Sequence, residues 1–274
     1  MRALFIALIL AGTTGLSGLS TNVSKNVSKW FESMRPKPPT QQEKEAQGRL
    51  VMFIGVDISG SFKDGRYFDD SIHFLARYIY AHLKGYEGLE VPHSLFVGTI
   101  GGDSKEDVKT LYPIQTFEDR SIEQVEEQLY TIFPRKRVNP YTDFNSFFQQ
   151  VADLVDARKL ILKPLSIVLL TDGVPDLGGN TRDEKFRNLN LKPLEGLSRN
   201  ITVRVLYTDA VTAKNWRDEV PRKRVKVWTQ DAVVMKEWDD PRTMVPGKSF
   251  AEQSRFFSWL KDNVDFAPRL KPVE

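Results

Sequence analysis

The chain has 274 residues, of which 41% are hydrophobic and 11% aromatic, and its formal net charge is +3 at pH 7. This length allows one large α/β domain or two small ones, and the apolar content excludes general disorder. The net charge is too small for its size to suggest nucleic-acid binding. Since the chain also has no RNP-like, finger or helix-turn-helix pattern, we expect no nucleic-acid partner.

The first twenty residues have the layout of a secretory signal. Arg2 precedes an apolar run over residues 3–11, and a tract of small residues continues to Ser20. The apolar run is short for a membrane-spanning helix, although the tract as a whole is just long enough for an uncleaved anchor. We therefore expect residues 1–20 to be a signal peptide or an N-terminal membrane anchor, and the protein to be exported to the periplasm or the cell exterior.

The rest of the chain divides into a tether, one domain and a tail. Residues 21–48 are polar and rich in proline, as in a linker. Strand and helix patterns alternate over residues 49–266, and residues 267–274 form the tail. Two short basic clusters, 135–137 and 222–224, are interpreted as solvated loop surface.

In chain order, the domain begins with a continuous apolar strand at residues 50–56. Apolar residues at helical spacing then predict a helix at 68–83, and a second strand follows at 94–100. Residues 110–117 are predicted to return antiparallel as an edge strand. Pro113 lies in this strand, and proline is tolerated at the edge of a sheet but not in its centre.

The second half continues this alternation, with a polar stretch at 174–200 that has room for one helix. The other predicted elements are helices at 122–132 and 144–155, a central strand at 165–170, strands at 201–207 and 225–228, and a closing helix at 250–264. Strands that alternate with helices predict an α/β fold. We expect a doubly wound, mostly parallel sheet with helices on both faces and one antiparallel edge strand.

Two of the apolar strands end abruptly in hydroxyl and carboxylate residues. Asp57, Ser59 and Ser61 follow the first strand, and Thr171-Asp172 follows the central one. Ligands of open α/β sheets bind outside the carboxyl ends of the strands. The chain has no cysteine, and its three histidines lie elsewhere, so only oxygen donors are present. Such donors indicate a hard divalent cation, Mg²⁺ first, with Ca²⁺ or Mn²⁺ as substitutes.

The complete pattern resembles the von Willebrand factor type A (VWA) family over roughly residues 49–266. Its three parts are Asp57-x-Ser59-x-Ser61, a threonine before a helix at Thr142, and Thr171-Asp172-Gly173 after a central strand. The resemblance implies a Rossmann-like VWA fold with a metal-ion-dependent adhesion site. It also implies that five side chains hold the cation, three through hydroxyls (Ser59, Ser61 and Thr142) and two through carboxylates, directly or through water (Asp57 and Asp172).

Each part of the pattern also has a simpler interpretation. The serines suit a strand-to-helix turn, Thr142 suits a helix N-cap, and Asp172-Gly173 suits a plain turn. The three parts in the right order, two of them at the ends of the most apolar strands, favour a metal site. Such a cation would keep one coordination position open, and a Glu or Asp carboxylate of a partner protein is its natural ligand.

We therefore expect an exported, Mg²⁺-dependent protein-binding module that is not an enzyme. One alternative is a metal-assisted phosphohydrolase with Asp57 as nucleophile, but Ser59 stands where phosphatases of the haloacid dehalogenase type need a second Asp, and no candidate base lies near the cation. Another alternative is a structural scaffold with a vestigial metal site. The polar segment 175–200 leaves the same sheet edge as Asp172, and we expect it to form part of the rim that selects the partner.

Overall fold

The computed structural model describes residues 48–63, 65, 67–101, 110–135 and 141–265. The expected signal or anchor, all of the tether but Gly48, and the tail lie outside these residues. Within the described ranges no helix is both long and apolar enough to cross a membrane.

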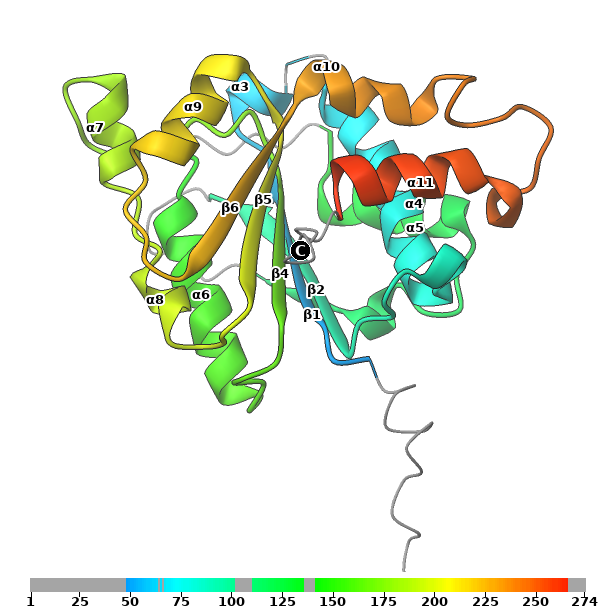
Figure 1. Cartoon of the computed structure of the whole chain (residues 1–274), viewed down its shortest axis with the longest axis horizontal. Coiled ribbons are helices and arrows are strands. Elements are labelled where there is room, and N and C mark those ends of the chain that lie inside the picture. Colours follow the sequence, from blue (N-terminus) through cyan, green and yellow to red (C-terminus); the bar gives the residue numbers. More distant parts are fainter. Residues whose placement is uncertain (1–47, 64, 66, 102–109, 136–140, 266–274) are drawn as a thin grey trace, which may run out of the picture. The chain divides into compact units, whose positions relative to one another are not determined.

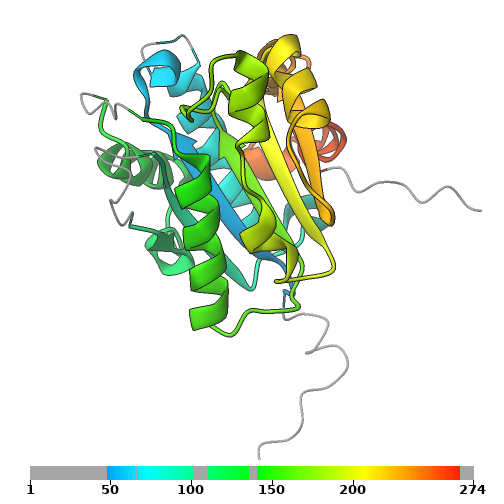
Figure 2. The same cartoon turned by 90° about the vertical axis from the view of Figure 1, so that its left-hand side faces the viewer.

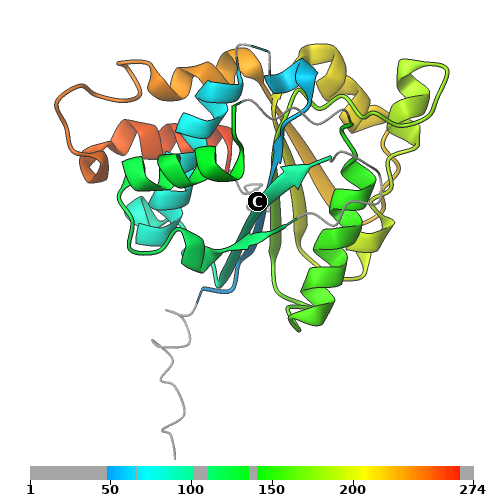
Figure 3. The ribbon, with the colours of Figure 1, turned by 180° about the vertical axis from the view of Figure 1, so that it is seen from behind.

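Six strands form one sheet in the order β3-β2-β1-β4-β5-β6 (Figure 1). Neighbouring strands pair in parallel except at one edge, where β3 pairs antiparallel to β2 (seen from behind in Figure 3). This arrangement confirms the predicted fold class. The strands are β1 (Val51–Asp57), β2 (Ser94–Ile100), β3 (Tyr112–Pro113), β4 (Leu165–Leu170), β5 (Ile201–Thr208) and β6 (Val225–Asp231).

Helices cover both faces of the sheet (Figures 1 and 2). One face carries α4 (Phe68–Lys84), α5 (Ile122–Ile132), α10 (Ala232–Met235) and α11 (Ser254–Asn263). The other face carries α6 (Phe144–Ala157), α7 (Arg182–Arg187), α8 (Lys192–Glu195) and α9 (Ala210–Asp218). The short elements are α3 (Gly60–Lys63), directly after β1, and four 3₁₀ turns, η1 (Tyr86–Gly88), η2 (Ile114–Thr116), η3 (Lys236–Asp239) and η4 (Phe250–Glu252).

Strand β1 is buried on both sides, which explains its continuous apolar run. Met52 and Ile54 pack into the core beneath α4 and α11, whereas Val51 and Phe53 pack into the core beneath α6. Successive side chains of a strand point to opposite faces, so a strand between two helical layers needs apolar residues at every position. Each such side chain contributes about 1.5–3 kcal/mol when fully buried. The two cores therefore hold Asp57, the last residue of β1, in a fixed place.

Several elements differ from the sequence-based expectation, among them the closing helix predicted at 250–264, which is the turn η4 followed by the helix α11. Strand β3 has only two residues and continues into η2, because Pro113 has no N–H to donate to a longer ladder. The stretch 174–200 holds two short helices, α7 and α8. Helix α9 was missed because few of its residues are apolar. It begins where the side chain of Asp209 accepts the N–H of Thr212, and it buries Trp216.

A buried ion pair connects α4 to the end of α11. Nε2 of His82 lies 2.8 Å from Oδ2 of Asp265, and Nδ1 lies 2.9 Å from the backbone carbonyl oxygen of Glu90. Both partners can only accept hydrogen bonds, so the imidazole is satisfied when both of its nitrogens carry protons. Burial lowers the pKa of His82, but Asp265 and the Glu90 carbonyl outweigh it and the pKa is raised. Burial raises the pKa of Asp265, but His82 and Arg204 outweigh it and the pKa is lowered.

We expect this pair to stabilise the fold most at mildly acidic pH. The raised pKa of His82 gives stabilisation that is complete below the ordinary histidine pKa and is lost as the pH rises through the folded value. The lowered pKa of Asp265 gives stabilisation that is lost as the pH falls through its folded value. Urea unfolding should show a difference of about 3 kcal/mol between wild type and His82→Gln near pH 5.5, and this difference should shrink as the pH rises through the raised pKa of His82. A difference that does not change with pH would contradict a charged His82.

Candidate metal centre

The predicted site residues lie at the point where the strand order reverses. Strands β1 and β4 are neighbours, and the chain proceeds from them in opposite directions across the sheet. Asp57 ends β1, and Thr171-Asp172 directly follows β4. The crevice outside the carboxyl ends of two such strands is the usual ligand site of this sheet topology.

Asp57 is the centre of the arrangement. Its side chain is fully buried, Oδ1 accepts the backbone N–H of Ser59 at 2.8 Å, and Oδ2 accepts the hydroxyl of Thr171 at 2.6 Å. The hydroxyl oxygen of Thr142 lies 3.5 Å from Oδ1 of Asp57. Three segments that are far apart in the sequence therefore meet at this carboxylate.

The loop after β1 holds its two serines side by side. The hydroxyl oxygens of Ser59 and Ser61 are 3.2 Å apart; Ser59 is buried and Ser61 is exposed. The next residue, Phe62, is buried and packs edge-on against the ring of Tyr207 at 6.1 Å. Lys63 donates to the backbone carbonyl of Pro134. These contacts anchor the two residues that directly follow the serines in the chain.

Thr142 does not cap the helix that follows it. The N-cap of α6 is Asp143, whose Oδ1 accepts the N–H of Ser146 at 3.0 Å. The hydroxyl of Thr142 is thus available to the crevice, and the simpler N-cap interpretation of this threonine is wrong. The carbonyl of Thr142 accepts the N–H of Asp176 at 3.1 Å, which joins this loop to the loop after β4.

Asp172 lies at the open side of the crevice and is partly exposed. Its Oδ1 accepts the N–H of Val174 at 3.0 Å. With Ser61 it lines a cavity of about 420 Å³ that also includes Tyr207, Asp209 and Asp231. Sequence patterns did not single out the last three residues. Asp209 and Asp231 each cap a short helix directly after a strand, which is the one signal that could have indicated them.

The electrostatics of the crevice favour a cation. Burial raises the pKa of Asp57 to about 6, hydrogen bonds from Thr171 and Ser59 oppose this, and the charge of Asp172 adds to it. The salt bridges among the described residues involve neither Asp57 nor Asp172. Two carboxylates without a cationic side chain between them would be neutralised by one divalent ion.

The donor set fits a hard cation. It consists of hydroxyl and carboxylate oxygens, which magnesium prefers and which soft metals do not. No group of three or more His, Cys, Asp or Glu side chains in the described ranges is placed to hold a metal. The candidate centre is of another kind, because three of its five donors are hydroxyls.

The segment 175–200, which we expect to contribute to the rim, lies in two different places. Residues from Pro175 to α7 stay near the carboxyl ends of the strands, and Arg182 reaches the start of α9, where it donates to Thr212 at 2.6 Å. The chain then runs along the face of the sheet to α8 and to the opposite edge, where Leu197 accepts the N–H of Leu162 (Figure 2). Only the first part of the segment 175–200 can therefore surround the crevice.

Thr171 has a role that the sequence did not reveal. It donates to Asp57, and its hydroxyl oxygen accepts the N–H of Gly173 at 2.9 Å. Thr171→Val would leave that N–H unsatisfied, and we expect it to lower the free energy of unfolding by about 1–3 kcal/mol in EDTA. Thr171→Ser keeps the hydroxyl and should recover most of the loss in urea titrations. Equal losses in both variants would mean that packing, not hydrogen bonding, explains the effect.

No protein-family profile and no curated protein sequence matches the chain. Several solved structures resemble its fold. Proximal thread matrix protein 1 from the mussel byssus has a TM-score of 0.41 and 13% identity, over 68% of this chain and 46% of that one. This chain thus spans less than half of that protein.

Two further structures resemble it in the same range. The VWA domain of SpRpn10 has a TM-score of 0.39 and 11% identity, over 66% of this chain and 88% of that domain. Manganese-loaded TRAP protein of Plasmodium vivax has a TM-score of 0.39 and 16% identity, over 69% of this chain and 70% of that one. Because these TM-scores and identities are low, the function is argued from the geometry of the crevice alone.

Proposed function

We propose that this protein is a Mg²⁺-dependent protein-binding module of the VWA type, whose metal-ion-dependent adhesion site binds a Glu or Asp side chain of a partner protein. The observation that carries the proposal is the meeting of three loops at Asp57. It brings the hydroxyls of Thr142 and Thr171 and the N–H of Ser59 to one buried carboxylate.

In this proposal each side chain has a separate task. Asp57 and Asp172 balance the two charges of the ion, and the hydroxyls of Ser59, Ser61 and Thr142 are neutral ligands. When bound, Mg²⁺ supplies an electrophilic position that a partner carboxylate can fill. Thr171 orients Asp57 through a hydrogen bond, as residues that hold metal ligands in place commonly do.

We further propose that the protein is exported and acts without catalysis. Export is supported by the signal-like residues 1–20. Binding without hydrolysis is supported by the surroundings of Asp57. The nucleophile of a phosphohydrolase has to reach its substrate, whereas this carboxylate is fully buried and already engaged by Thr171 and Ser59.

A peptide-display selection tests the partner chemistry. The immobilised protein is exposed to random peptides in Mg²⁺, and bound peptides are eluted with EDTA. We expect the selected peptides to share a Glu or Asp, and binding to be lost when that residue is changed to Gln or Asn. Asp57→Ala should select nothing above background, whereas Asp156→Asn, an exposed change on α6, should select the same peptides. Selected peptides that bind equally in EDTA would refute the proposal.

A further inference from the structure

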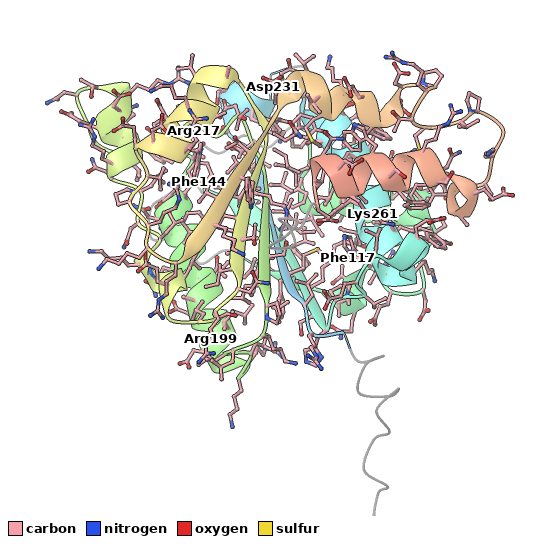
Figure 4. The ribbon with its side chains drawn as sticks, viewed as in Figure 1. Phe117, Phe144, Arg199, Arg217, Asp231 and Lys261 are labelled. Atoms are coloured by element: carbon pink, nitrogen blue, oxygen red, sulfur yellow. The ribbon has the colours of Figure 1, made fainter. Side chains whose placement is uncertain are left out.

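The loops that precede the parallel strands form a surface on the side opposite the candidate metal centre. The amino-terminal ends of all parallel strands lie on the same side of a sheet, so these loops lie together (Figure 1). Figure 4 places Arg199, in one of them, at the end of the molecule away from Asp231. We call this surface the amino edge and define it as residues 48–50, 85–93, 158–164, 196–200 and 221–224.

The amino edge concentrates positive charge. Its five loops contain eight Lys or Arg residues and two Asp or Glu residues, a net charge of +6, while the whole chain carries +3. The rest of the chain is therefore net negative. One of the two acids, Glu90, uses its carboxylate to accept the backbone N–H groups of Arg49 and Leu50. The basic residues are Arg49, Arg158, Lys159, Lys163, Arg199, Arg222, Lys223 and Arg224.

One loop of this basic surface carries two exposed apolar side chains, which we call the apolar tip. In the loop between α6 and β4, Leu162 is 75% exposed and Ile161 is 44% exposed. Basic residues flank the pair in the sequence, with Arg158 and Lys159 before it and Lys163 after it. Single exposed apolar residues are ordinary, but an exposed apolar pair next to basic residues combines the two features with which proteins bind anionic membrane interfaces.

The fold holds this tip in place. Leu162 has a φ of +73°, a left-handed conformation that is unfavourable for leucine. Its N–H donates to the carbonyl of Leu197 at 2.7 Å, which fixes the turn. Leu160 is buried in the core beneath α6, and its N–H donates to Val155 at 2.9 Å. The exposed leucine is thus presented by a hydrogen-bonded turn that is anchored on both sides.

We propose that the amino edge docks on an anionic lipid surface, with Ile161 and Leu162 entering the boundary between headgroups and acyl chains. The basic side chains around them would contact the lipid phosphates, except Arg222, whose guanidinium donates to the backbone carbonyls of residues 216, 217 and 220. A polyanion such as nucleic acid would use the charge but not the apolar tip, which favours lipid as the occupant. The chain also enters the domain at this edge, since Gly48 precedes β1.

Docking in this orientation would turn the metal centre away from the membrane, towards a partner in solution. The inference does not depend on metal binding, because no residue of the amino edge belongs to the crevice. Within the basic cluster 222–224, the exposed Lys223 and Arg224 would then belong to the lipid-binding surface.

The absence of cysteine makes a direct test possible in the full-length chain. A polarity-sensitive fluorophore is attached to Leu162→Cys and, as the matched control, to Val233→Cys, which is 68% exposed and lies on the opposite side at the start of α10. Vesicles of phosphatidylcholine with and without phosphatidylglycerol are added. We expect a blue shift and protection from iodide at position 162 with the anionic vesicles, and neither effect at position 233.

Charge reversal tests the electrostatic part. Each basic residue near an anionic surface is worth about fivefold in binding, so Lys159→Glu with Lys163→Glu should weaken docking of the label by at least about 25-fold. The control Lys214→Glu with Lys248→Glu changes the net charge equally on exposed residues elsewhere and should dock as the parent does. High salt should also weaken docking, as Lys159→Glu with Lys163→Glu does, because it screens the attraction between the basic residues and the lipid.

Three results would overturn the proposal. The label at position 162 could stay in water although the protein is bound to vesicles. The blue shift could be equal with and without phosphatidylglycerol. A blue shift that needs no vesicles and grows with protein concentration would assign the amino edge to a second copy of the chain.

Discussion

Asp57→Asn should abolish stabilisation by Mg²⁺ and yet make the metal-free protein more stable. The raised pKa of Asp57, about 6, means that its carboxyl is harder to ionise in the folded protein than in the unfolded chain. In EDTA the ionised carboxylate therefore costs up to about 3 kcal/mol at pH 7, and this cost disappears as the pH falls below about 4. Asparagine has nearly the same shape, still accepts the N–H of Ser59 and carries no charge, while its NH₂ group can donate to the hydroxyl oxygen of Thr171, so that this bond reverses direction.

The measurement is urea unfolding of wild type and Asp57→Asn in EDTA and in Mg²⁺. Wild type should gain about 2.7 kcal/mol when Mg²⁺ is present at a hundredfold excess over its Kd, whereas the variant should gain nothing. Asp70→Asn is the matched control. Asp70 is a partly buried carboxyl whose pKa is also raised by burial, but it is not one of the five candidate ligands; it accepts from Trp238 and from Tyr207, whose ring lines the cavity. Its Mg²⁺ response should equal that of wild type.

This prediction separates a cation site from a mere polar turn. If Mg²⁺ stabilised both proteins equally, the ion would bind elsewhere. A loss of stability of Asp57→Asn in EDTA would show that the carboxylate serves the fold through its hydrogen bonds, as the scaffold alternative requires.

Gly101→Ala should be severely destabilising and should also weaken Mg²⁺ binding. Gly101 follows β2 with a φ of +80°, and a Cβ there would lie 1.8 Å from the carbonyl oxygen of Tyr141 and 3.2 Å from Cα of Thr142. Both contacts are with backbone, so a rotamer change cannot relieve them. The segment that carries the Thr142 hydroxyl has to move, and we expect a loss of about 3 kcal/mol or more in the free energy of unfolding.

Gly247→Ala is the matched control, because Gly247 has the same φ of +80° but no atom within 4 Å of the added Cβ. It should lose only about 1 kcal/mol from backbone strain, with unchanged Mg²⁺ affinity. Urea unfolding gives the stabilities, and calorimetric titration with Mg²⁺ gives the affinities. Equal losses in the two alanine variants would show that the approach of Tyr141 to Gly101 is unimportant.

The order of the elements was predictable because, along most of the chain, the spacing of apolar residues in the sequence matches the side chains that the fold buries. Strand β1 lies between two helical layers and reads as an unbroken apolar run, and α5 was predicted to its last residue. Helix α9 was not predictable in this way, because one buried tryptophan replaces the usual apolar stripe. Its presence depends on tertiary contacts, among them the indole N–H of Trp216 donating to Gly173 at 2.8 Å.

The crevice was predictable in its residues but not in its geometry. The motif named Asp57, Ser59 and Thr142, and the structure places them together. The motif could not show that Thr171 holds Asp57, because a threonine at a strand end is common and its rotamer is set by a partner on another strand. Nor could it show why residue 101 is glycine, since that depends on where the Tyr141 carbonyl lies.

The bond from Asp176 to the Thr142 carbonyl has a consequence for protein engineering. Two of the three loops are braced by main-chain atoms, which no choice of side chains can reproduce. Copying the five donor residues onto another parallel sheet should therefore yield scattered oxygens and no cation affinity. A functional copy has to include all three loops with their backbone hydrogen bonds, together with Gly101, which leaves room for the Tyr141 carbonyl.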